Sequence, residues 1–319
     1  MRSARSLFWL QLALGTLGAA AAALAATAAL RSVNPALPSW TDLRAACSTM
    51  LSGGTVGRML IVALASIGLA VPVRAARSII RQAWGARRLL RSLAAVGTQD
   101  GSPPVITVAE ERPLAFCAGL LHPRIYVSTG ARQLLGHREL CAVIAHERHH
   151  ARRRDPLRGL IVEAVRDAVF FVPVLAGCRA RYGSLAELAA DEHAIAAAGV
   201  RPLAGALATF DAHGGPLVAV SAERVDHLLG ARSEWQLRPT VLIASLSSIA
   251  SVAALAGATF TVVGREHVTL VGLASTGCGV ASLALVAIAA RLVVKLFGQP
   301  GPSGRQASGW TIQRCDRRP

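Results

Sequence analysis

The chain has 319 residues, of which 53% are hydrophobic and only 16% are charged, and its formal net charge is +16. Its mean hydropathy of +0.45 exceeds that of an ordinary soluble domain, so the composition indicates a membrane protein. The six cysteines show no C-x-x-C spacing, which argues against a disulfide-stapled secreted domain.

The positive charge, nearly all of it arginine, requires an anionic partner. Nucleic acid would call for a basic motif interleaved with aromatic residues, and no such motif is present in a chain with only 4% aromatic residues. We therefore expect the partner to be the anionic inner leaflet of a membrane, with no direct binding of nucleic acid.

Four apolar runs predict four transmembrane helices, in residues 1–30, 59–73, 240–263 and 268–294. The first run is long enough to cross a hydrocarbon core of about 30 Å, although a cleaved secretory signal is the alternative. The last two runs are separated by only a few residues, so they form a tight helical hairpin.

The segments between these spans set the topology. Residues 31–58 form an extracytoplasmic loop, and residues 74–104 form a basic linker whose arginines mark a cytoplasmic flank. Residues 105–239 form a domain, and residues 295–319 form a flexible basic tail. The N-terminus, the domain and the tail then all lie on the cytoplasmic side of a multi-pass cell-membrane protein.

The domain contains a helix that carries a metal-binding pattern. Apolar residues at helical spacing predict a helix from His137 to Asp155, with the Asp-Pro pair as its stop signal. Within it, His146, Glu147 and His150 form an H-E-x-x-H motif. Two imidazoles four residues apart lie on one helical face, where zinc accepts both, and Glu147 is placed to act as a general base. The alternative is a polar helix face whose charges are merely solvated.

A catalytic zinc needs a third protein ligand, and Glu187 follows on a second predicted helix. Asp191, one turn later, is placed to accept a hydrogen bond from a ligating imidazole. Glu192 is the rival carboxylate, but it points away from that face. We interpret His149 and His193 as non-ligands.

The run from Leu157 to Cys178 is apolar enough to suggest a fifth span. A single crossing would place Glu187 across the membrane from His146, so we interpret this run as an amphipathic helix with a bend at Pro173. A re-entrant hairpin is the alternative.

These motifs resemble the membrane-bound gluzincin peptidases, which include the HtpX-type endopeptidases and the BlaR/MecR-type antibiotic-sensing transducers. The resemblance covers about residues 105 to 230. Its matching stretches are Pro113 to Gly119, His122 to Gly130, Glu139 to His150, Arg154 to Pro156 and Glu187 to Asp191.

The resemblance implies a mainly α membrane protein whose four transmembrane helices carry a cytoplasmic α+β zinc peptidase domain of minigluzincin type in residues 105–239, with one zinc ion per chain. Short β-branched runs at residues 105–108 and 124–128 agree with a small sheet in front of the zinc helix. The resemblance makes Ile125, Tyr126 and Val127 candidates for the edge strand that holds the substrate backbone. It also implies a transition-state stabiliser beyond the third ligand, for which His213 and Arg224 are the candidates.

The leading hypothesis is endoproteolysis at the cytoplasmic face, with a protein substrate. By resemblance, that substrate is either a DNA-binding repressor or a misfolded membrane protein. The transducers carry a sensor with a Ser-x-x-Lys motif, and the chain departs from them here. Lys295 is the only lysine, and Leu292 occupies the position of the required serine. The alternative function is a catalytically inactive membrane scaffold or receptor with a structural zinc.

Overall fold

The computed structural model describes residues 4–31, 33–34, 55–99, 102–213, 222–228, 237–262 and 268–269. Its helices are α1 (Ala4–Arg31), α3 (Thr55–Arg91), α4 (Thr129–Leu134), α5 (His137–Arg153), α6 (Asp155–Ala168), α7 (Val174–Ala198), α8 (Val200–Ala212), α9 (Ala222–Leu228) and α10 (Pro239–Val262). Its strands are β1 (Val33–Asn34), β2 (Ala95–Gln99), β3 (Val105–Val108), β4 (Ala115–Ala118), β5 (Arg124–Ser128) and β6 (Val268–Thr269).

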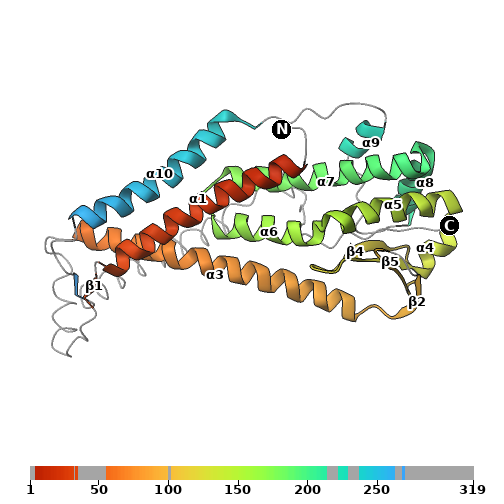
Figure 1. The fold of residues 1–319 in the computed structure, drawn as a ribbon, viewed down its shortest axis with the longest axis horizontal. Coiled ribbons are helices and arrows are strands. Elements are labelled where there is room, and N and C mark those ends of the chain that lie inside the picture. The colour runs from red at the N-terminus through yellow and green to blue at the C-terminus, as the bar shows by residue number, and fades with distance from the viewer. Residues whose placement is uncertain are drawn as a thin grey trace, which may run out of the picture.

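Within the described residues, three helices are long and apolar enough to cross a membrane, namely α1, α3 from Met59 onward, and α10 up to Thr259. They correspond to the first three predicted spans and lie side by side at one end of the molecule (Figure 1). The predicted fourth span, residues 268–294, lies outside the described residues except for Val268 and Thr269, which form β6 beside β1.

The segment predicted as a basic linker, residues 74–104, is helical for most of its length. Helix α3 continues without a break from Thr55 to Arg91, and β2 follows it. The arginines mark a flank of the span but do not end the helix, because arginine, alanine and leucine are all good helix formers. The membrane helix therefore extends directly into the rest of the molecule.

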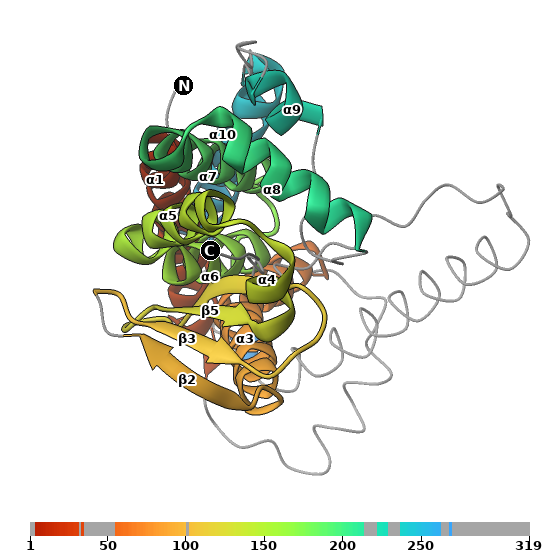
Figure 2. The ribbon, with the colours of Figure 1, turned by 90° about the vertical axis from the view of Figure 1, so that its right-hand side faces the viewer.

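The four-stranded sheet has the order β2-β3-β5-β4, in which only β3 and β5 are parallel. Strands β3 and β5 coincide with the predicted runs 105–108 and 124–128, whereas β2 joins the sheet from outside the predicted domain. Helix α5 lies between the sheet and the helices α7 and α8 (Figure 2). Phe116, Ile125, Leu140 and Phe210 belong to the core formed between the sheet, α5 and α8.

Helices α6 and α7 form a hairpin that enters the bundle of candidate spans and returns. The turn falls between Ala168 and Val174, so the predicted bend at Pro173 is present and the chain makes no single crossing here. The hydroxyl of Ser245 in α10 accepts a hydrogen bond from the backbone N–H of Val174 (3.0 Å). The hydroxyl of Ser248 donates one to the carbonyl of Phe171 (2.8 Å). These two hydrogen bonds connect the tip of the hairpin to α10, one of the candidate spans.

Small residues allow this close approach. A Cβ atom added to Gly18 of α1 would lie 2.2 Å from a methyl group of Val169. On the other side of the hairpin, Ser78 and Arg81 of α3 donate hydrogen bonds to Asp167 at 2.7 and 3.1 Å. Glycine contacts and one polar cluster therefore fix the hairpin between α1 and α3.

Candidate metal centre

Helix α5 presents both histidines of the H-E-x-x-H motif to one point. It begins after Gly136, whose backbone N–H donates a hydrogen bond to the Glu139 carboxylate (2.9 Å). Its last residue is Arg153, and the next residue, Arg154, has a left-handed backbone conformation (φ 53°) that ends the helix. His146 and His150 are both buried, and their Nε2 atoms lie only 3.2 Å apart. Two nitrogens so placed can bind one ion.

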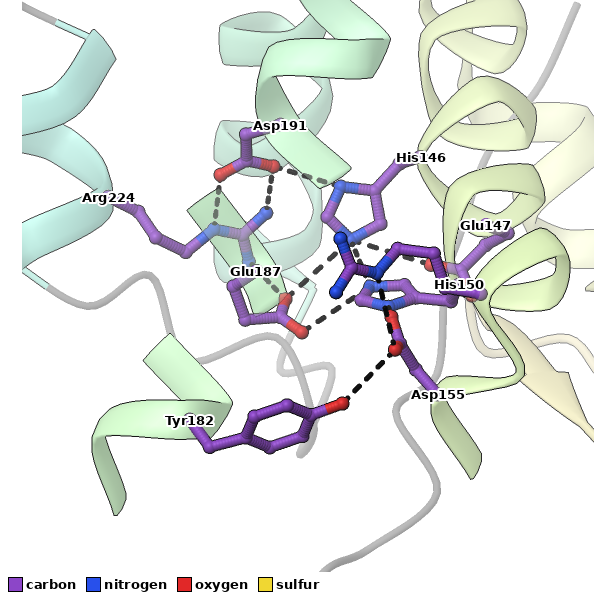
Figure 3. A network of polar contacts seen from close by, with 9 residues as sticks. His146, Glu147, His150, Asp155, Tyr182, Glu187, Asp191 and Arg224 are labelled. Atoms are coloured by element: carbon purple, nitrogen blue, oxygen red, sulfur yellow. Dashed lines mark hydrogen bonds and ion pairs between the residues drawn. The ribbon is translucent and has the colours of Figure 1, made fainter. Parts of the chain in front are cut away.

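Helix α7 packs against α5 and brings Glu187 to the same point (Figure 3). Its Oε2 lies 3.6 Å from Nε2 of His146, and its Oε1 lies 3.4 Å from Nε2 of His150. One ligand atom from each of the three residues falls within 4.8 Å of the others. The rival Glu192 is 67% exposed and pairs instead with His227 (3.8 Å).

A carboxylate holds the far nitrogen of each imidazole. Nδ1 of His146 lies 2.9 Å from Asp191, and Nδ1 of His150 makes a 2.9 Å hydrogen bond with Asp155. Such contacts place the proton on Nδ1 and direct the Nε2 lone pair toward a metal. The donor set of two imidazoles and one carboxylate therefore fits a divalent ion such as zinc.

Each supporting carboxylate has a further donor. Arg224 of α9 donates from Nε (2.7 Å) and Nη2 (2.6 Å) to Asp191, and its Nη1 lies 3.6 Å from Glu187. The hydroxyl of Tyr182 donates to Asp155 (3.2 Å). Asp155 and Tyr182 are not among the predicted site residues. The Arg-Asp-Pro segment after the motif was the available signal for Asp155, but no local pattern marks Tyr182.

Glu147 lies beside the histidines and is almost completely buried, with 1% of its surface exposed. Its Oε1 is 3.6 Å from Nε2 of His146, and neither of its oxygens has a side-chain hydrogen-bond partner in the described part of the chain. Burial raises the pKa of this carboxyl above its ordinary value, although His150, His146 and the backbone of Cys117 oppose the shift. A buried carboxylate with a raised pKa next to a metal position is the arrangement that a general base requires.

The charges of the cluster depend on one another. Burial disfavours the charged form of His146, but hydrogen bonding to Asp191 and Glu187 outweighs it and raises the pKa to about 10. The pKa of Glu187 falls to about 2, because His146, His150 and Arg224 outweigh the cost of burying its carboxylate. In the absence of metal, a proton on His146 thus supplies positive charge that an ion would otherwise provide.

A cavity of about 440 Å³ opens beside Glu147 and is mainly apolar. Residues of α3, β4, α5, α6 and α7 line it, among them Gln82 of α3, Cys117 of β4, His150 of α5, Leu160 of α6 and Glu187 of α7. The continuation of the candidate span in α3 therefore forms one wall of the cavity.

Two other predicted groups are placed differently. Ile125, Tyr126 and Val127 are not on an edge strand, because β5 pairs with β3 on one side and β4 on the other. The sheet edge beside the cavity is β4. His213 ends α8, is exposed and contacts the carbonyl of Thr209 (2.7 Å), so of the two candidate stabilisers the structure brings only Arg224 to the cluster.

Comparison with known proteins supports the same class. The sequence matches the family described as BlaR1 peptidase M56 over residues 27–201, more than half of the chain. The chain therefore belongs to the M56 peptidase family. This result confirms the resemblance to membrane-bound metallopeptidases of the HtpX and BlaR type.

Two curated relatives are protease HtpX homologues. The one from Desulfatibacillum aliphaticivorans is 34% identical over 83 residues, which are 25% of this chain and 27% of the relative. The one from Acidiphilium cryptum is 33% identical over 93 residues, or 28% and 32% of the two chains. The chain thus spans less than a third of the length of either relative, and no solved structure matches it.

Proposed function

We propose that this protein is a zinc-dependent endopeptidase of the cell membrane that cleaves protein substrates at the cytoplasmic face. The observation that carries the proposal is the convergence of His146, His150 and Glu187 beside the buried carboxylate of Glu147, at the floor of a cavity. The M56 family and the HtpX homologues support the same chemistry.

The side chains divide the reaction between them. Zinc held by the two histidines and Glu187 would polarise the scissile carbonyl and make the attacking water more acidic. Glu147 takes a proton from that water as it attacks the carbonyl carbon, and it then delivers the proton to the leaving amine. Asp191 and Asp155 keep the imidazoles oriented throughout.

Strand β4 supplies a place for the substrate backbone. Ile125 donates its N–H to Pro104 on the β3 side, so Cys117, which faces Ile125 across the β4–β5 pair, directs its own N–H and carbonyl to the outer edge. An extended peptide that adds to this edge forms main-chain hydrogen bonds with little regard to sequence, next to Glu147.

Two classes of biological substrate belong to this proposal. The match to the BlaR1 peptidase family favours regulatory cleavage, for example of a DNA-binding repressor, and the HtpX homologues favour quality control of membrane proteins. Exposed arginines of α3, Arg77 and Arg88 among them, are available to the anionic inner leaflet.

The test compares the full chain purified in detergent with Glu147→Gln and with the control Glu192→Gln, whose side chain is exposed. We expect one zinc per chain in all three proteins, and cleavage of an unfolded protein such as casein by the wild type and the control alone. A wild type that binds zinc but cleaves neither casein nor a candidate repressor would favour a membrane scaffold or receptor instead.

A further inference from the structure

The first candidate span reaches the metal centre through a single aromatic side chain. Phe8 of α1 is buried, and its ring centroid lies 6.0 Å from that of Tyr182 with an interplanar angle of 43°. The guanidinium of Arg158, on α6, lies over the other part of the ring at 5.5 Å from its centroid. Phe8 thus occupies the space between α6 and α7 at the base of their hairpin.

Tyr182 is the next link. It is completely buried, and its hydroxyl donates a hydrogen bond to Asp155 (3.2 Å). The other oxygen of Asp155 accepts a hydrogen bond from Nδ1 of His150 (2.9 Å) (Figure 3). The Tyr182 hydroxyl therefore helps to position Asp155, which in turn orients the imidazole of His150. Loss of the Phe8 ring would leave a space beside the Tyr182 ring, and a shift of the phenol into that space would move its hydroxyl relative to Asp155.

We propose that Phe8 is a positioning residue for the metal centre: by packing on Tyr182 it holds Asp155 in place, and Asp155 orients the ligand His150. The inference rests on the proposed metal site and extends it, because it makes α1 a structural part of that site. His146 has an independent support in Asp191 and Arg224, so Phe8 acts on one of the two imidazoles.

This role differs from ordinary core packing in what it predicts. A residue that only fills space changes the stability of the fold and leaves the metal affinity of the folded molecules unchanged. A residue that acts through the Tyr182 hydroxyl loses its influence once that hydroxyl is removed. Its effect is therefore not additive with that of Tyr182→Phe.

The experiment measures zinc affinity of the full chain in detergent by competition with a chromophoric chelator, for Phe8→Ala, Tyr182→Phe and the double variant. Removal of a group that orients a ligand typically lowers metal affinity about 10-fold to 100-fold. We expect the lower end of that range, about tenfold, for each single variant, and no further loss in the double variant. Phe8→Tyr, which keeps the ring, should retain the wild-type affinity.

The control is Leu17→Ala, on the same helix but 53% exposed, which should leave zinc affinity unchanged. Cobalt in place of zinc gives a second readout, because its absorption spectrum reports the ligand geometry. An unchanged spectrum and affinity in Phe8→Ala, or additive losses in the double variant, would overturn the inference. A wild-type chain that binds neither metal would instead contradict the proposed function.

Discussion

Arg224 donates two hydrogen bonds to Asp191, and its remaining nitrogen faces Glu187. One guanidinium therefore supports the predicted ligand Glu187 and also the carboxylate that orients the ligand His146. A planar fork of this kind cannot be replaced by the single ammonium of lysine. We expect Arg224→Lys to lower zinc affinity about 10-fold to 100-fold, measured by chelator competition. Arg201→Gln, at an exposed position of α8, is the control. Unchanged zinc affinity with lost cleavage would show instead that Arg224 acts on the reacting carbonyl.

The identity of the third ligand can be tested with two neighbouring carboxylates of α7. Glu187→Gln removes the charge of a carboxylate whose two oxygens lie 3.6 Å from Nε2 of His146 and 3.4 Å from Nε2 of His150. We expect it to lower zinc affinity by about two orders of magnitude or more. Glu192→Gln, five residues further on, should bind zinc like the wild type. If the two variants lose zinc equally, α7 supplies its ligand differently from the structure.

Zinc binding should depend steeply on pH. In the metal-free protein the pKa of His146 is raised to about 10, and the pKa of His150 is also raised, whereas Glu187 is already ionised. Zinc accepts only neutral imidazole, so His146 must release a proton and the affinity rises with pH. Between about pH 7 and pH 9 the slope approaches about one proton per ion, or about tenfold per pH unit. Competition titrations at several pH values measure it, and a flat profile would contradict the raised pKa values.

The same shift governs the stability of the metal-free protein. The folded state binds a proton on His146 more tightly than the unfolded chain does, so the stabilisation is fully present below the ordinary pKa of 6.5. It is lost as the pH rises toward about 10. Thermal unfolding after chelation of the metal should show a midpoint that falls over this interval, and saturating zinc should remove the dependence.

The packing of the hairpin on α1 is open to a direct test. Gly18→Leu places a side chain where even a Cβ atom would lie 2.2 Å from Val169. We expect overpacking to destabilise the fold by about 1–3 kcal/mol. Gly257→Leu is the matched control, since that glycine of α10 has no neighbouring atom within 4 Å of an added Cβ. Thermal unfolding in detergent compares them, and equal midpoints would mean that α1 and α6 are not in contact.

Local patterns in the sequence were sufficient for part of this architecture. The spacing of His146 and His150 follows from one helix, and the runs at 105–108 and 124–128 follow from β-branched residues between turn formers. Strand order has no such local signature, because it is decided by which strands meet after the chain folds. This is why Ile125, Tyr126 and Val127 were assigned to an edge that β4 occupies.

The same limit explains the site residues that were missed. The sequence predicts a helix stop at Asp155, whereas α5 ends at Arg153 and Asp155 begins α6. Its contact with His150 depends on the left-handed conformation of Arg154 between the two helices. Tyr182 reaches Asp155 only because α6 and α7 pack as a hairpin. The basic run after Val73 predicts a linker because a high density of arginines indicates which side of the membrane a segment lies on. Whether the helix continues through that segment depends instead on the helix propensity of its residues.

The α6–α7 hairpin also connects the candidate metal centre to the candidate membrane spans, so the two parts cannot be separated without cutting through their shared core. Its base carries Asp155 and Tyr182, and its tip is bonded to Ser245 and Ser248 of α10. The catalytic half and the membrane half therefore share one continuous core, which contains Leu7, Val169 and Tyr182 together. A fragment cut out at the ends of the apolar helices would uncover the middle of that core. The candidate metal centre is therefore part of one folded unit with the candidate membrane spans, and it is not a separate soluble domain joined to them by a linker.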